Sequence, residues 1–106
     1  MKYSMMSRED VQTLLEGVLG SDHVYFQAPP NTGMQYPCIV YNFVRPYVRH
    51  ANNKPYIVTG YWEIHHMYKS VKNDLKETMI FAAPYIAFDR RLVTNGVYND
   101  YYTLYK

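Results

Sequence analysis

Cysteine is almost absent from this chain of 106 residues, which contains a single one, Cys38. One cysteine allows neither a disulfide within the chain nor a zinc site built from cysteines, and its rarity favours a reducing compartment. Cys38 lies in the apolar sequence "PCIVY" with no base beside it. It is therefore predicted to be a small buried side chain and not a nucleophile.

Long apolar runs are also missing. No segment approaches the roughly 20 apolar residues of a membrane span, and the start, "MKYSMMSRED", has no run long enough for a signal peptide. The five glycines are scattered, so no glycine-rich phosphate loop occurs. The net charge is only +2, which is too small to argue for nucleic-acid binding. We expect a protein made in the cytoplasm, with no membrane and no specific nucleic acid as partner.

Tyrosine is what the sequence has in excess. The chain contains 13 tyrosines, which supply most of its 17% aromatic residues, and 48% of its residues are hydrophobic. This composition is typical of a globular chain, and the length suits one domain over residues 1–106. Because tyrosine combines a large apolar ring with a polar hydroxyl, it suits both protein cores and protein interfaces.

The clearest local signal is a helix in "SREDVQTLLEGVLG", predicted over residues 8–19. Ser7 is a good N-cap, and Glu9 and Asp10 place negative charge in the first turn, where the helix dipole favours it. Apolar residues recur at helical spacing, and Gly20 can adopt the left-handed conformation that ends a helix.

The remainder reads mostly as strands. "HVYFQ" predicts a short strand, and residues 28–37 predict a loop. Residues 38–49 predict a long strand, in which Pro46 belongs at an edge or a bulge. "ANNKP" predicts a turn or a longer loop. "YIVTGYWEIHHMYK" predicts a second long strand that Gly60 could interrupt. "SVKNDLKETMIFAAP" predicts a helix capped by Ser70 and ending before Pro84. Two final strands are joined by Asn95-Gly96, a strong hairpin signal.

The expected order is therefore α-β-β-β-α-β-β. Because strands follow one another directly, we predict an α+β, sandwich-like fold with a mainly antiparallel sheet flanked by two helices. The predicted core is Leu14, Leu15, Val18, Ile39 or Val40, Trp62, Ile64 and Leu75.

"EIHH" is the one stretch that resembles a metal or acid–base site. On a strand, Glu63 and His65 share one face, while His66 shares the other with Trp62 and Ile64, the better core candidates. His65 and His66 therefore point apart, and two ligands make at most half of a tetrahedral zinc site. We expect no catalytic, metal or cofactor site, and interpret Glu63 and His65 as part of a solvated or partner-facing surface.

"FVRPYVRHANNK" indicates an interaction surface. Alternation places Arg45, Tyr47 and Arg49 on one strand face, and His50 and Lys54 extend the basic character into the following turn. Cations interleaved with an aromatic could contact phosphates, an acidic protein surface or only water. Because the net charge is low, we rank a protein partner above nucleic acid.

Several segments together resemble the small tail-terminator, or tail-completion, proteins of long-tailed phages and prophages. They are "HVYFQAPP", "MQYPCIVYNF", "ANNKPY" and "FDRRLVTNGVYNDYYTLY", in that order over about residues 11–105. The resemblance implies a sheet flanked by helices and no catalysis. It also implies a ring, usually hexameric, that caps the tail tube, contacts the head connector and is located in the virion tail or neck. The sequence "HHMYKSVKND" replaces the acidic, proline-containing turn of such proteins.

Three other functions remain open. A neck or head-completion adaptor is the nearest alternative. A small hydrolase or nuclease would use Glu63, His65 and His66 and requires a cleft with convergent polar groups. A nucleic-acid-binding module would use Arg45, Arg49 and Lys54 and requires an affinity that falls steeply with salt.

Overall fold

The structure is a computed structural model, and it describes residues 2–3, 6–27, 36–83 and 85–105. Its elements are β1 (Lys2–Tyr3), α1 (Arg8–Leu19), β2 (Val24–Phe26), β3 (Cys38–Ala51), β4 (Lys54–Tyr68), the short 3-10 helix η1 (Val71–Asn73), α2 (Lys76–Ala82), β5 (Ile86–Thr94) and β6 (Val97–Tyr105). Apart from β1 and η1, this order is the predicted one. Most of the predicted 28–37 loop, residues 28–35, lies outside the described residues.

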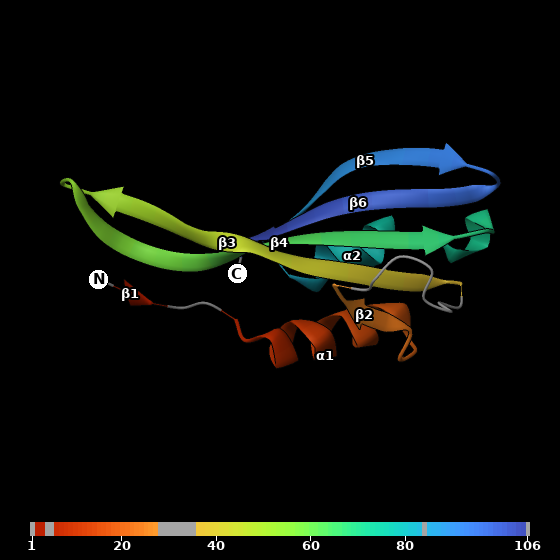
Figure 1. Cartoon of the computed structure of the whole chain (residues 1–106), viewed down its shortest axis with the longest axis horizontal. Helices are drawn as coiled ribbons and strands as arrows, with labels where there is room; N and C mark the ends of the chain where they lie inside the picture. Colours follow the sequence, from red (N-terminus) through yellow and green to blue (C-terminus); the bar gives the residue numbers. More distant parts are fainter. Residues whose placement is uncertain (1, 4–5, 28–35, 84, 106) are drawn as a thin grey trace.

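The strands form one sheet in the order β2-β3-β4-β6-β5, and β1 pairs with β4 away from this path (Figure 1). The pairs β3–β4, β4–β6 and β6–β5 are antiparallel. β2 runs parallel to β3, and β1 runs parallel to β4. The fold is α+β with a mostly antiparallel sheet, as predicted. Both helices contribute to one core on the same face of the sheet, so the domain has two layers and the other sheet face has no helix of the described chain on it.

The signals at the helix and hairpin ends act as the sequence predicts. The Ser7 hydroxyl accepts a hydrogen bond from the Asp10 backbone N–H at 3.1 Å, and Gly20 ends α1 at φ 80°. Asn95 and Gly96 turn the chain between β5 and β6 with φ values of 52° and 76°. Such positive values are what a two-residue hairpin turn needs, and asparagine and glycine tolerate them best.

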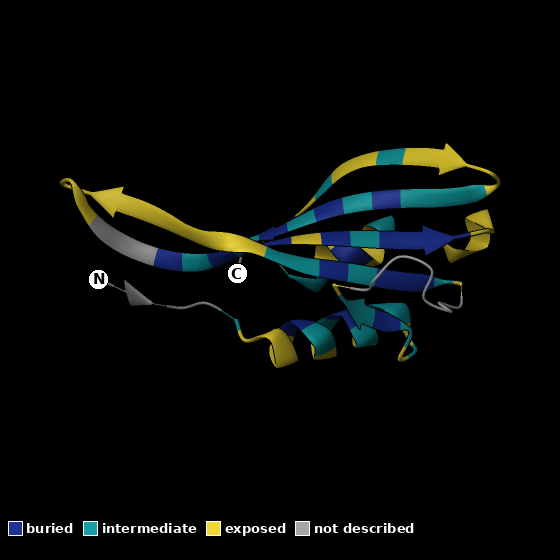
Figure 2. Cartoon of the chain, viewed as in Figure 1, coloured by how far each residue is buried: buried dark blue, intermediate teal, exposed yellow. Residues whose placement is uncertain are grey.

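The core lies between the helices and the facing side of the sheet (Figure 2). Leu15, Ile39, Trp62 and Ile64 are buried as predicted, and so is Cys38. The prediction overestimated the burial of the other residues, because Leu14 and Val18 are only partly buried against the core and Leu75 is half-buried.

The second helix is shorter than predicted. Ser70 caps only η1, and α2 begins at Lys76, because the Asp74 carboxylate accepts a hydrogen bond from the Lys76 backbone N–H at 2.9 Å. The same carboxylate binds Arg91 of β5 at 2.8 Å. Val71, a predicted apolar position of the helix, is consequently 63% exposed.

The most unusual feature is a β-hairpin that extends beyond the body (Figure 1). β6 ends opposite Tyr61, and β2 accompanies β3 only to Tyr41. Residues 44–60, here called the arm, therefore continue as the β3–β4 pair, with only β1 beside Ile57 and Val58. Gly60 does not interrupt β4, and the molecule reaches 49 Å along its longest axis.

Candidate functional site

The arm begins at a bulge that sets which side chains it exposes. Phe43 pairs with Trp62 on the core face, and one residue is then inserted, so that Arg45 pairs with Tyr61 on the open face. Regular pairing follows from Arg45 to Arg49. Arg45, Tyr47 and Arg49 therefore share the open face, as their spacing predicts. Pro46, opposite Gly60, lies where β3 has no described strand on its outer side, which is an edge position as predicted.

The base of the arm is held to the body by aromatic contacts. The Arg45 guanidinium lies over the Tyr61 ring at 5.2 Å from its centroid. Tyr105 at the end of β6 contacts both Tyr61 and Tyr47, at centroid distances of 5.0 and 5.1 Å. Such edge-to-face and cation–π contacts each contribute about 0.5–1 kcal/mol, enough to orient the arm without burying it.

The tip of the arm is basic and fully exposed. Asn52 and Asn53 make the turn with φ values of 54° and 63°, and His50 and Lys54 flank it. Every residue from Val44 to Lys54 is exposed. The predicted interface residues Arg45, Tyr47, Arg49, His50 and Lys54 are therefore parts of one projecting element.

The other two predicted residues lie on the open sheet face, in the body. Glu63 is exposed, whereas His65 is half-buried, stacked on Tyr101 at 4.4 Å, with Nε2 2.9 Å from the Asn99 side-chain oxygen. Burial lowers the pKa of His65. The Arg90 guanidinium lies over the same Tyr101 ring, 4.4 Å from its centroid. A shallow polar hollow of about 170 Å³ lies beside Glu63, His65 and Arg90.

His66 points to the opposite face, as predicted, and is fully buried. Its ring stacks on Tyr68 at 4.5 Å, and neither ring nitrogen has a hydrogen-bond partner among the described residues. Burial lowers its pKa to about 4, so the imidazole is neutral at pH 7. Since His65 and His66 lie on different sides of the sheet, they cannot bind one ion or act on one substrate together. Within the described part of the chain, no three histidine, cysteine or carboxylate side chains are grouped to hold a metal ion.

A buried ionic cluster is what the sequence reasoning missed. Asp100 is fully buried, and Arg91 binds its two oxygens through Nε at 2.7 Å and Nη2 at 3.0 Å. The Tyr68 hydroxyl donates to Asp100 Oδ2 at 2.8 Å, and Arg91 reaches Asp74 as well. Burial raises the pKa of Tyr68, and Asp100 raises it further. Because Arg91 binds both carboxylates, the cluster ties the segment before α2 to the sheet.

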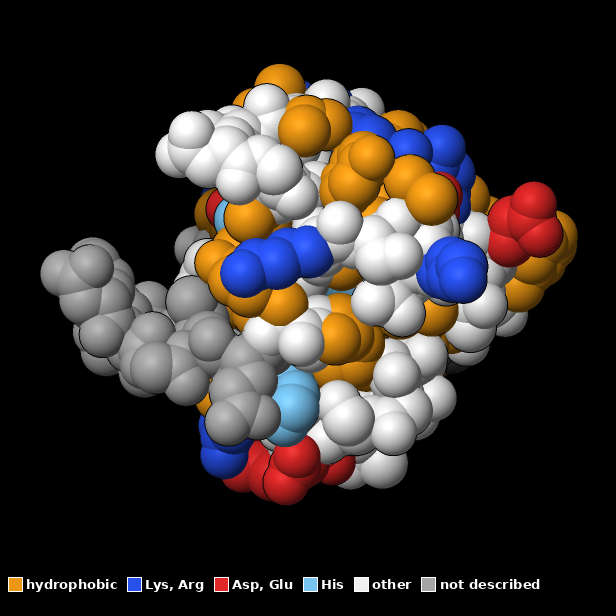
Figure 3. Space-filling view, turned by 90° about the vertical axis from the view of Figure 1, so that its right-hand side faces the viewer, with side chains coloured by type: hydrophobic (Ala, Val, Ile, Leu, Met, Phe, Trp, Pro, Cys, Tyr) orange, Lys and Arg blue, Asp and Glu red, His pale blue; other side chains and the backbone are white. Residues whose placement is uncertain are grey.

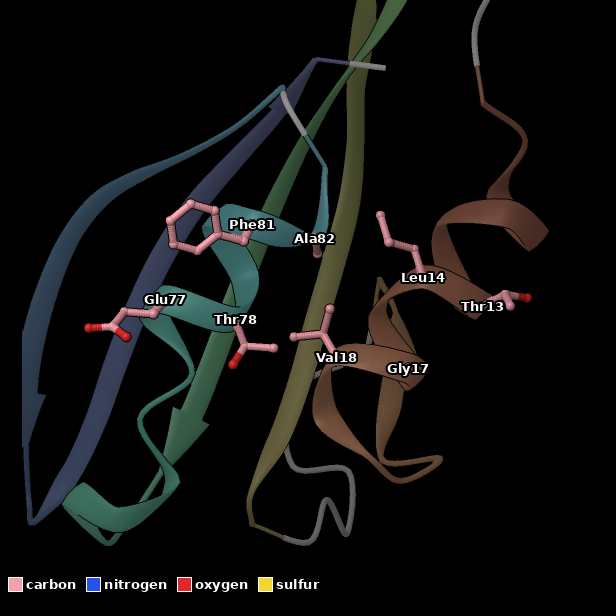
Figure 4. A pocket seen from close by; sticks show the side chains of 8 residues that line it. All are labelled: Thr13, Leu14, Gly17, Val18, Glu77, Thr78, Phe81 and Ala82. Carbon is pink, nitrogen blue, oxygen red and sulfur yellow. The ribbon is translucent and has the colours of Figure 1, made fainter.

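A groove of about 690 Å³ lies between the two helices. It is lined from α1 by Thr13, Leu14, Gly17 and Val18 and from α2 by Glu77, Thr78, Phe81 and Ala82. Leu14 and Val18 point from α1 toward α2 (Figure 4). The Phe81 side chain is 84% exposed.

The end of the body opposite the arm has a mixed surface. In Figure 3, hydrophobic side chains there alternate with charges of both signs. By contrast, the arm contains three cations, Arg45, Arg49 and Lys54, and no carboxylate. The charge of the molecule is therefore segregated at the arm and mixed at the opposite end.

No known family model, curated protein or solved structure matches this chain. Among the described residues, no helix combines the length and the apolar character that crossing a bilayer requires.

Proposed function

We propose that this chain is a structural assembly protein that forms a ring on a phage tail tube and joins it to the head connector. The observation that carries this proposal is the arm. It is a two-stranded extension whose exposed surface contacts little of its own chain, although isolated two-stranded hairpins are at best marginally stable in water. Such an element gains its stability and its purpose when it contacts another molecule.

The chemistry of the arm supports a protein partner. Arginine and tyrosine are enriched at the centres of protein interfaces, and the arm presents Arg45, Tyr47 and Arg49 on one face. Val44, the residue inserted at the bulge, is 43% exposed, and Val48, which is 38% exposed, adds apolar area on the opposite face of the arm. A surface of this kind suits a second copy of the chain or a tail protein.

The station in the virion, a ring on the tail tube, rests on the resemblance of "MQYPCIVYNF" and the "NDYYTLY" ending to tail-terminator proteins. A neck adaptor between head and tail would use the same arm and the same open sheet face. The two stations differ in which structure the protein binds, the finished tail tube or the head connector.

The first experiment is the solution mass of the purified protein by light scattering, alone and with tail tubes, followed by electron microscopy of the tubes. We expect a closed multimer at the tube end. A chain that stays monomeric and leaves the tubes unlabelled would refute the proposal, and labelling of the connector alone would favour the adaptor.

A charge-reversal pair tests the arm itself. Arg45→Glu with Arg49→Glu should leave the circular dichroism spectrum unchanged, because exposed charges contribute little to stability. It should abolish complementation of a phage that lacks this protein, because the new carboxylates repel the partner surface. The matched control is Lys69→Glu with Lys72→Glu, which reverses two exposed cations in the body and should still complement. Normal complementation by the arm variant would remove the arm from the interface.

A further inference from the structure

The groove between α1 and α2 has apolar walls that the described residues leave uncovered. Leu14 and Val18 of α1 are only partly buried, and Phe81 of the α2 lining is among the most exposed hydrophobic side chains described. A phenylalanine ring left in water forgoes about 1.5–3 kcal/mol of burial. The apolar walls and the exposed ring together are typical of a docking surface.

Gly17 is an independent sign of an occupant. It lies in the last turn of α1 and lines the groove, although a glycine inside a helix costs about 1 kcal/mol relative to alanine. Apart from the backbone of α1 and the two neighbouring residues, no atom of the described chain lies within 4 Å of the position that a Cβ would take there. No contact among the described residues therefore requires glycine at this position, whereas a second molecule that approaches the helix backbone would.

The charges around the groove are the opposite of those on the arm. The one charged side chain in the described groove lining is Glu77 of α2. The first turn of α1 adds Glu9 and Asp10 against Arg8, whereas Glu16 is bound by Gln12 and the Lys76 ammonium lies over the Phe88 ring. The arm offers three cations, no carboxylate, and the exposed valines 44 and 48. The arm and the groove thus each combine apolar area with charge, and the charges are of opposite sign, although Val48 and the two arginines lie on different faces of the arm.

The arm of a molecule points away from its own helices, which pack on the body (Figure 1). We propose that the α1–α2 groove receives the arm of a second copy of this chain. The contact joins two different surfaces, arm and groove, so each copy can bind one neighbour at each end. Repetition of such a head-to-tail contact closes into a ring where the rotation permits. This inference rests on the proposed assembly function and names the two surfaces that carry it.

The test is a disulfide between copies. Val48→Cys places a thiol on the arm, and Gly17→Cys places one in the groove. Native Cys38 does not compete, because it is fully buried and burial raises the pKa of its thiol to about 11. An oxidised equimolar mixture of the two variants should form a covalent dimer that neither variant forms alone. The control is an oxidised mixture of Val48→Cys with Thr94→Cys, an exposed site in β5. No covalent dimer should form in this mixture, so all chains should separate as monomers when the sample is denatured.

A second variant separates docking from folding. Gly17→Trp places a large ring in the groove. Its Cβ meets no atom outside its own helix, and tryptophan has a higher helix propensity than glycine, so the urea midpoint of the free chain should not fall. The association constant between copies should fall about tenfold or more, because the tryptophan ring occupies the groove in which the arm binds. An unchanged association constant would overturn the inference.

The outcomes distinguish the two proposals. A multimer in which only Gly17→Cys cross-links with itself would replace arm docking by symmetric groove-to-groove pairing. A multimer without any cross-link between arm and groove would overturn this inference and leave the assembly function standing. A wild-type chain that stays monomeric at millimolar concentration and on tail tubes would overturn both.

Discussion

Arg91 and Arg90 are adjacent in β5, and the structure predicts very different consequences for their removal. The Arg91 guanidinium holds the Asp100 carboxylate, which is 0% exposed, through two hydrogen bonds. Arg90 lies on the open face, paired with Asp89 at 3.0 Å, and both of these side chains are more than half exposed. Replacement of each arginine by methionine retains much of the apolar stem and removes the charge.

The expected magnitudes differ because the environments differ. Breaking a buried ion pair costs about 3–5 kcal/mol, since the remaining charge stays buried without its partner. Because the Arg91 side chain is 31% exposed, we expect the lower end, about 3 kcal/mol, for Arg91→Met. Arg90→Met should cost less than about 1 kcal/mol, the range of surface pairs and exposed cation–π contacts.

The assay is urea unfolding followed by the fluorescence of Trp62, the only tryptophan, which is 3% exposed. A third variant, Arg91→Met with Asp100→Asn, removes both charges and should lose about 1–3 kcal/mol less than the sum of the two single changes. If Arg91→Met were no less stable than Arg90→Met, the cluster would not be the tie between the α2 segment and the sheet that its geometry indicates.

Three further predictions concern the core, the helix and the response to acid. Leu15→Ala should cost about 2–5 kcal/mol in urea unfolding because Leu15 is fully buried, and a change below about 0.5 kcal/mol would show that α1 does not dock through it. Gly17→Ala should stabilise the free chain by about 1 kcal/mol, since its Cβ meets no neighbour, and a lower urea midpoint would contradict this. Burial lowers the pKa of His66 from 6.5 to about 4, so between these pH values the unfolded chain binds a proton that the folded chain does not. The free energy of unfolding should therefore decline as the pH falls through this window, by up to about 3 kcal/mol. His66→Phe should remove most of this decline, and an equally steep decline in the variant would assign it to other groups.

Local signals in the sequence predict local structure well here. The limits of α1 follow from Ser7 and Gly20, and the β5–β6 turn follows from Asn95-Gly96, because a capping hydroxyl and a positive φ are requirements of one or two residues. The faces of β4 follow from strict alternation, which separates His65 from His66.

Bulges are where the same alternation fails. A residue is inserted between Phe88 and Arg90 of β5, so Phe88 and Arg91 share the core face although three positions separate them. Without this insertion Arg91 would point into solvent, and the cluster with Asp100 would not exist. The shortened second helix has the same origin, because Asp74 binds Arg91 instead of continuing a helix. Neither feature has a signal in the sequence that could be read without knowing the tertiary contact.

The free edges of the sheet bear on the association of copies that we propose. β5 lies at one end of the sheet, and its bulge and the run Asp89-Arg90-Arg91 interrupt the regular, apolar edge that strand addition requires. At the other end β2 has only three residues, and the outer edge of β3 in the arm contains Pro46, which has no N–H to donate. Both ends therefore disfavour pairing of strands between copies. The association that we propose therefore uses side chains on faces and in grooves, as in the contact of the exposed arm with the helix groove.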